Sequence, residues 1–179
     1  MMWLKQSTVA VINFGPVVDK TDGVTLEVAA GIITSFDAAA TGIMLSKNGG
    51  TLAVREQGAN FVASTYDAHG CYKVSLSAID TGTLGRLRVI HTEPATYLAV
   101  WHDFMVVTAD AYAFLTNAAI EGTQTFWGMF KIMAAVLAGK SSGGGTATIV
   151  FRDVADTKPR ITATADTNGN RSAVTLDGA

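Results

Sequence analysis

Cys71-Tyr-Lys-Val-Ser-Leu76 and, after a turn, Leu84-Gly-Arg-Leu-Arg-Val-Ile90 are the two stretches that decide the fold. In both, apolar and polar residues alternate. Successive side chains of a β-strand point to opposite faces of its sheet, so each stretch predicts a strand with one buried face and one face toward water. Arg86 and Arg88 are expected on the outer face. The two stretches indicate an antiparallel sheet.

Outward from this pair, short apolar runs separated by turn residues continue the same pattern. Asn48-Gly49 lies between two of them, and Asn-Gly predicts a tight hairpin because both central residues must accept a positive φ. Strand spacing of this kind is typical of a β-sandwich. We therefore expect a mainly β protein whose residues 1–108 form an antiparallel β-sandwich, Ig-like or jelly-roll-like. The further predicted strands are 9–14, 24–29, 42–47, 51–55, 61–64, 97–101 and 103–107.

The composition changes after residue 108. Residues 109–140 predict a helical segment, with a short helix over 109–119 and an apolar helix over 125–138. Thr123 or Thr125 can cap the start of the apolar helix, and Gly139 is well placed at its end. A Gly/Ser hinge then leads into a small three-stranded β module within residues 141–179, with strands at 146–152, 160–165 and 172–176. So small a sheet is marginal alone and needs a partner surface.

The apolar helix is the strongest indication of oligomeric state. A helix that lies on its own domain shows one apolar stripe and a polar back. Lys131 is the only charged residue between Glu121 and Lys140, so a polar back is missing and two buried faces are expected. The second face could meet another part of the same subunit, or copies of the chain around a symmetry axis. We favour self-assembly, with a trimer as the preferred copy number. The candidate interface consists of two seams at heptad spacing: Phe126, Phe130, Met133 and Leu137, beside Met129, Ile132 and Val136.

Composition limits the classes of partner. Thirteen basic and fifteen acidic residues leave a net charge of −2, spread along the chain, so nucleic acid is not an expected partner. The most apolar stretch, residues 126–138, is shorter than the roughly 20 residues that a bilayer requires, so membrane insertion is not expected. Cys71 is the only cysteine, which excludes an internal disulfide and fits folding in a reducing cytoplasm.

Chemistry-bearing residues are few, and neither a cofactor nor a metal is expected. His69, His91 and His102 have no metal-ligand spacing and are interpreted as surface or strand-edge residues. His102 and Asp103 are neighbours on a strand and should face opposite sides. Residues 166–170 resemble the start of a calcium loop but lack its glutamate, and a hairpin turn explains them. We expect no enzyme, although a hydrolase acting on a cell-surface polymer stays open because sequence alone does not exclude a Ser-His-Asp or Cys-His arrangement.

Several motifs resemble a family of structural proteins of tailed bacteriophages. They are Trp3-Leu-Lys-Gln-Ser-Thr8, Gly15-Pro16, Asp19-x-x-Asp-Gly23, Leu45-Ser-Lys-Asn-Gly-Gly50, His69-Gly-x-Tyr72, Asp80-Thr-x-Thr-Leu-Gly-Arg-Leu87, Val100-Trp-His-Asp103, Met133-Ala-Ala-Val-Leu-x-Gly-Lys140, Phe151-Arg-Asp-Val, Asp156-Thr-Lys158, Arg160-Ile-Thr162 and Asp166-x-Asn-Gly-Asn-Arg171.

The resemblance implies a virion component made in the cytoplasm of a bacterial host. It would be a homo-oligomeric attachment or decoration protein, such as a tail or head fibre, spike or adaptor. Its partners would be itself and other phage virion proteins of the capsid, neck or tail. The alternative is a receptor- or carbohydrate-binding β-module that binds a host surface glycan through exposed aromatic residues, with Tyr66, Tyr97 and Trp101 as candidates.

Overall fold

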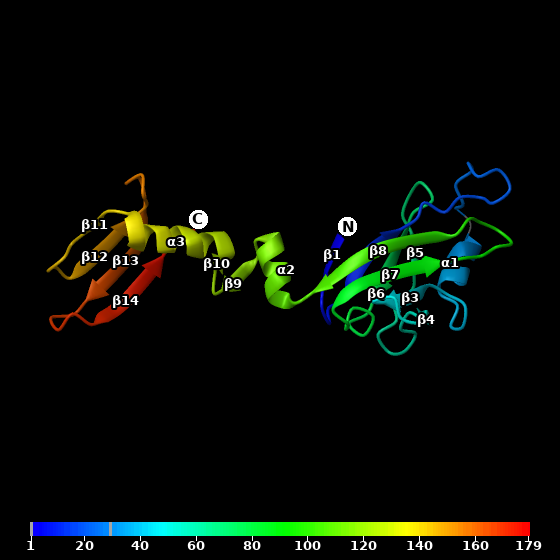
Figure 1. Ribbon diagram of the computed structural model, residues 1–179, viewed down its shortest axis with the longest axis horizontal. Coiled ribbons are helices and arrows are strands. Elements are labelled where there is room, and N and C mark those ends of the chain that lie inside the picture. Colours follow the sequence, from blue (N-terminus) through cyan, green and yellow to red (C-terminus); the bar gives the residue numbers. More distant parts are fainter. Residues whose placement is uncertain (1, 29) are drawn as a thin grey trace. The chain divides into compact units, whose positions relative to one another are not determined.

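The computed structural model describes residues 2–28 and 30–179, and it is mainly β (Figure 1). The chain divides into two compact units, residues 1–109 and residues 110–179.

Unit 1 contains two sheets. The first has five strands in the order β1 (Met2–Lys5), β8 (Val100–Val107), β7 (Gly85–His91), β3 (Met44–Lys47) and β4 (Ala53–Val54). The second has three strands in the order β2 (Ala10–Phe14), β6 (Tyr72–Leu76) and β5 (Thr65–Tyr66). All pairings are antiparallel except that of β1 with β8, which is parallel.

The two sheets share one hydrophobic core. Ile12 of β2 and Val74 of β6 belong to the same buried cluster as Leu87 of β7 and Phe104 of β8. The predicted alternation is confirmed in β6 and β7, where every second residue is buried. Phe36, at the end of the short helix α1 (Ala30–Phe36), is also part of the core. The buried faces therefore pack on each other as in a sandwich.

Most of the predicted strands in unit 1 are present, with shifted ends. The runs 97–101 and 103–107 contribute to one continuous strand, β8, and Asn48 and Gly49 have the positive φ angles of 52° and 77° that their turn requires. The strand predicted at 61–64 is wrong, since the extended pair lies at Thr65–Tyr66. Strand β1 and helix α1 were not predicted.

The strand predicted at 24–29 is also wrong. Its described part, residues 24–28, forms only an isolated bridge between Leu26 and Val18, and Ala29 lies outside the described residues. The Asp22 carboxylate accepts hydrogen bonds from the backbone N–H groups of Val24 and Thr25, both at 2.9 Å. This local side-chain contact competes with strand pairing and holds the backbone in a turn.

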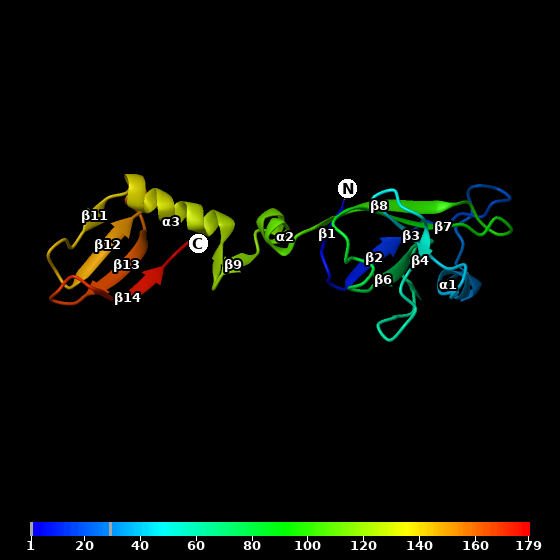
Figure 2. The same cartoon turned by 60° about the horizontal axis from the view of Figure 1, so that its bottom comes forward.

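Unit 2 begins with short elements and ends in a sheet. Helix α2 (Ala109–Thr116) spans the unit boundary. The small hairpin of β9 (Ala119–Glu121) and β10 (Gln124–Thr125) follows, then helix α3 (Phe126–Ala138). The sheet has the antiparallel order β11 (Ser141–Ser142), β12 (Thr148–Arg152), β13 (Pro159–Ala165) and β14 (Arg171–Leu176). Figure 2 shows α3 lying across this sheet.

Two expectations for unit 2 need correction. The sheet has four strands rather than three, because Ser141 and Ser142 of the expected Gly/Ser hinge pair with Phe151 and Val150. The first helix ends at Thr116 instead of 119, where Asn117 takes a positive φ of 52° and the chain turns into β9. The predicted apolar helix 125–138 is confirmed as α3, with Thr125 as its N-cap.

Candidate self-assembly surface

Helix α3 is capped at its start and lies close to other backbone segments of unit 2 near both of its ends. At its start, the hydroxyl oxygen of Thr125 accepts a hydrogen bond of 3.1 Å from the backbone N–H of Gly128. Gly128 also lies against the backbone of Gly178, where an added Cβ would meet the Gly178 Cα at 3.2 Å. At its end, Gly139 lies against the carbonyl of Arg152. The helix therefore has a defined position on the sheet.

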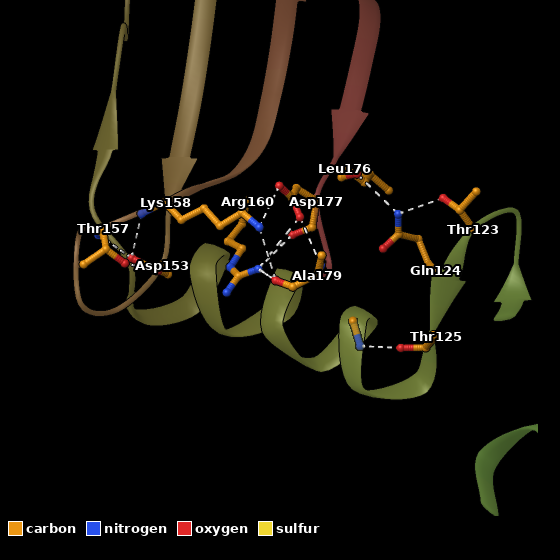
Figure 3. Close-up of polar contacts among 11 residues, drawn as sticks. Thr123, Gln124, Thr125, Asp153, Thr157, Lys158, Arg160, Leu176, Asp177 and Ala179 are labelled. Atoms are coloured by element: carbon orange, nitrogen blue, oxygen red, sulfur yellow. Dashed lines mark hydrogen bonds and ion pairs between the residues drawn. The ribbon is translucent and has the colours of Figure 1, made fainter. Parts of the chain in front are cut away.

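Polar contacts tie the segment after β14 to the same region (Figure 3). Gln124 donates from Nε2 to the Leu176 carbonyl at 3.3 Å, and the Lys158 ammonium lies 3.0 Å from the Asp177 carboxylate. Arg160 donates to the carbonyl oxygens of Asp177 and Ala179. These contacts hold the end of β14 beside the first turn of α3.

The sheet under α3 has one apolar face. Cross-strand pairing places Phe151 of β12 opposite Ile161 of β13, and Ile161 opposite Leu176 of β14. The next row on this face consists of Ile149, Ala163 and Val174. Ile161 and Ala163 are buried, whereas Val174 and Leu176 remain exposed. Helix α3 thus covers the middle of the apolar face and leaves the β14 side uncovered.

The face of α3 toward the sheet consists of Gly128, Ile132 and Ala135, which are all buried. At about 100° per residue, these three positions lie within one narrow sector of the helix. Phe126, Phe130, Met133 and Leu137 lie on the opposite side. This set, the first predicted seam, is called the α3 ridge below.

Most of the ridge is exposed in unit 2. Leu137 is 81 % exposed and Met133 is 52 % exposed, while Phe130 is also exposed and Phe126 is half-buried. The second seam is divided: Ile132 is buried on the sheet, Met129 is half-buried and Val136 is exposed. The structure thus places six of the seven candidate residues at or near an open apolar surface and assigns Ile132 to the fold of its own subunit.

An aromatic cluster extends this surface to α2. The ring of Phe114 lies 4.4 Å from that of Phe126 between centroids, and Phe126 lies 4.7 Å from Phe130. Trp127 contacts both Phe126 and Phe130 and is exposed. Helix α2, whose residues are all described, buries none of its side chains. The sequence did not reveal that α2 joins this surface, because its apolar residues form no clear stripe.

Unit 2 has little interior of its own. Its buried apolar residues, among those the structure describes, are Ile132, Ala135, Ile161 and Ala163, and none belongs to the large cluster that fills unit 1. Its exposed large apolar residues are far more numerous: Phe114, Leu115, Ile120, Trp127, Phe130, Met133, Val136, Leu137, Val154, Val174 and Leu176. Monomeric soluble proteins rarely expose large contiguous apolar patches, and Phe114, Trp127 and Phe130 of this set all contact the ring of Phe126.

The remaining predicted residues lie elsewhere. His69 is exposed, but His91 is only 2 % exposed, which corrects its interpretation as a surface or strand-edge residue. It is buried because it ends the inward-facing row of β7, where Nδ1 lies 2.8 Å from the Tyr97 hydroxyl. His102 contacts the Gly15 backbone and Asp103 faces Arg88, so their predicted separation on opposite faces is confirmed.

The aromatic residues named for glycan binding differ in exposure. Tyr97 is buried in the core of unit 1, whereas Tyr66 and Trp101 are exposed. Asp166, in the calcium-like stretch, accepts hydrogen bonds from the backbone of Asn168 and from Asn170. These bonds lower the pKa of Asp166, and its carboxylate serves the turn between β13 and β14. Among the described residues, no group of three or more His, Cys, Asp and Glu side chains could hold a metal ion.

Comparison with known protein families, with characterised proteins and with solved structures finds no match for this chain. Within the described part of the chain, no helix has the length and apolar character needed to cross a membrane.

Proposed function

We propose that this chain is a structural protein that assembles into a homo-oligomer through unit 2 and presents unit 1 to its surroundings. The observation that carries the proposal is the α3 ridge, an apolar row that points away from the sheet of unit 2 that its helix covers. In unit 2 by itself this row lies in water. In an oligomer it would meet the same row of neighbouring copies.

The energy of burial favours assembly. Burying a half-exposed Phe, Met, Val or Leu contributes on the order of 1 kcal/mol to the free energy of association. The ridge and the exposed apolar residues beside it therefore supply several kcal/mol. A thirteen-residue helix is only about 20 Å long, and a stable interface needs about 800 Å² from each partner. The ridge must therefore share the interface with α2 and with Val174 and Leu176 of β14.

The resemblance to tailed-phage structural proteins suggests what the oligomer builds. A stable β-sandwich joined to an assembly module is suited to an attachment or decoration protein of a virion, and we favour a trimer. Localisation of several copies in a map of the virus particle supports this role. Purified particles that lack the chain contradict it.

The oligomer itself is tested with the purified full chain. Light scattering coupled to size exclusion is expected to give a mass that is a multiple of the chain mass, and the double substitution Met133→Glu/Leu137→Glu is expected to give a monomer. Val154→Glu is the matched control, because Val154 is an exposed apolar residue of unit 2 in the turn between β12 and β13. It should leave the mass unchanged. A monomeric native chain across the micromolar range contradicts the proposal.

A second candidate function is binding of a host glycan by unit 1. The observation that favours it is Trp101, a large aromatic side chain near the start of β8 that is 53 % exposed. Aromatic rings that stand in water on a rigid scaffold are common anchors of binding sites. The surface around Trp101 indicates which kind of glycan would bind.

A further inference from the structure

The outer face of the five-stranded sheet carries two arginines that share one carboxylate. Arg88 of β7 lies directly across from Asp103 of β8 and donates two hydrogen bonds of 2.9 Å to it, from Nε and Nη2. Arg86 lies two residues earlier on the same face and donates to the same two oxygens at 3.3 and 3.1 Å. Asp103 is therefore fully engaged by the two side chains.

This arrangement leaves positive charge and free donors on the surface. Each guanidinium has five N–H donors, of which Asp103 takes two. The remaining donors of Arg86 and Arg88 are available, and two cations against one carboxylate leave a net charge of +1. Because Asp103 already fixes both guanidinium groups, little side-chain freedom is lost when an anion binds. Arginine groups held in this way suit a second carboxylate.

A hollow of about 310 Å³ lies beside the arginines. Arg86 and Arg88 line it together with Ser46, Gly49, Leu52 and Ile90. It thus has a cationic side and, in Leu52 and Ile90, an apolar side. Trp101 is the cross-strand partner of Ile90, so an exposed aromatic ring continues the apolar side.

We propose that this hollow binds a sugar residue that bears a carboxylate, such as a uronic acid within a surface polysaccharide. The carboxylate lies on Arg86 and Arg88, the C–H groups of the ring lie on Leu52 and Ile90, and the next sugar of the chain packs on Trp101. A volume of about 310 Å³ is at the small end of ligand sites and fits one monosaccharide. The apolar side favours a sugar acid over a bare inorganic anion, which has no apolar face to cover it.

The proposal concerns unit 1 alone, so it does not depend on assembly through unit 2. The test is an NMR titration of the isotope-labelled full chain with methyl β-D-glucuronide, with methyl β-D-glucoside as the neutral counterpart. We expect saturable shifts of backbone amides in residues 46–52 and 86–90 with the glucuronide, at a dissociation constant of roughly 1 mM or below. The glucoside should give none.

Substitutions then assign the contact. Arg88→Gln is expected to weaken binding by about tenfold or more, the usual loss for a charge-assisted hydrogen bond. Lys73→Gln is the matched control, because it removes one positive charge from β6 in the other sheet, where Lys73 pairs with Asp67 at 3.2 Å. It should bind as the native chain does.

Three results would overturn the proposal. The first is equal binding of the neutral and acidic sugars, and the second is no saturable shift with the glucuronide. The third is inorganic phosphate binding to the same amides at least as tightly, which would indicate a general anion site. The backbone-amide shifts of the native chain decide between these outcomes even if the Arg88→Gln variant does not fold.

Discussion

Gly139 ends α3 so close to Arg152 that a Cβ built on the glycine would lie 1.9 Å from the Arg152 carbonyl oxygen. Its backbone is extended, with φ −79° and ψ 163°, so the glycine is required by the close approach of two backbones and not by a left-handed conformation. The contact joins the end of α3 to the last residue of β12.

Gly139→Ala is therefore expected to destabilise unit 2 by roughly 1–3 kcal/mol or more, because either the helix or β12 must move. Hydrogen exchange of the amides in α3 and β12 measures the effect. Gly144→Ala is the control, since a Cβ on Gly144 meets no atom within 4 Å and its φ is ordinary. Equal exchange rates in the two variants would show that the close approach does not stabilise the unit.

Ile132 and Met133 are neighbours with opposite expected roles. Ile132→Ala should lower the free energy of unfolding of unit 2 by about 2–4 kcal/mol, because its side chain is 8 % exposed and packs on the sheet. Met133→Ala should instead weaken association, so that its effect on stability depends on protein concentration. Denaturation curves at several concentrations separate the two. If only Ile132→Ala gave a loss of stability that depends on protein concentration, the assignment of the two helix faces would be reversed.

Arg55 forms a buried ion pair in unit 1. It is 1 % exposed, pairs with Asp37 and donates to the Ser75 carbonyl at 2.8 Å. Removal of one partner leaves the other charge without compensation, so Arg55→Ala should lower the free energy of unfolding by about 3–5 kcal/mol. The double substitution Arg55→Met/Asp37→Leu should recover part of that loss, because it removes both charges. Chemical denaturation measures both variants, and a double variant at least as unstable as Arg55→Ala would contradict the expectation.

His91 makes unit 1 sensitive to acid. Burial lowers the pKa of its imidazole below the ordinary 6.5, against smaller opposing effects of the Ser35 backbone and of Glu93. At acidic pH the unfolded chain therefore binds a proton at His91 more readily than the folded chain does. The stability that unit 1 gains from a neutral His91 is complete above pH 6.5 and is lost as the pH falls through the lower pKa of the folded state. His91→Phe should flatten the dependence of the melting temperature on pH in this range. The exposed His69, changed to Gln, should leave it unaltered.

Asp103 titrates in a more acidic range. The hydrogen bonds from Arg88, and after them those from Arg86, lower its pKa from 3.8 to about 2. Its contribution to stability is therefore complete above about pH 4 and is lost as the pH falls toward 2. NMR observation of the side-chain carboxyl carbon should give a midpoint near 2 in the native chain and a higher one in Arg88→Gln. An unchanged midpoint would show that the pair does not hold the carboxylate charged.

The sequence by itself determined the features that depend on local periodicity. Alternation in residues 72–76 and 85–91 specified strands with one buried face, and Asn48-Gly49 specified a turn, because these patterns act over a few neighbouring residues. Thr123 or Thr125 was expected at the start of α3 for the same reason, and the structure has Thr125 as the N-cap. The single charge along α3, Lys131, predicted two buried faces, of which the structure shows one, formed by Gly128, Ile132 and Ala135.

Tertiary structure alone decided which face of α3 is buried and which strands bury it. The helix packs on β12 and β13, which follow it in the chain. This contact buries Ile132 and leaves Met133 and Leu137 exposed. The tertiary structure buried His91 through the packing of α1 and Tyr97 around β7. It also brought Arg86 and Arg88 to one carboxylate on β8. Side-chain periodicity assigns a residue to a face of its own strand, whereas strand register determines which residue of another strand it meets.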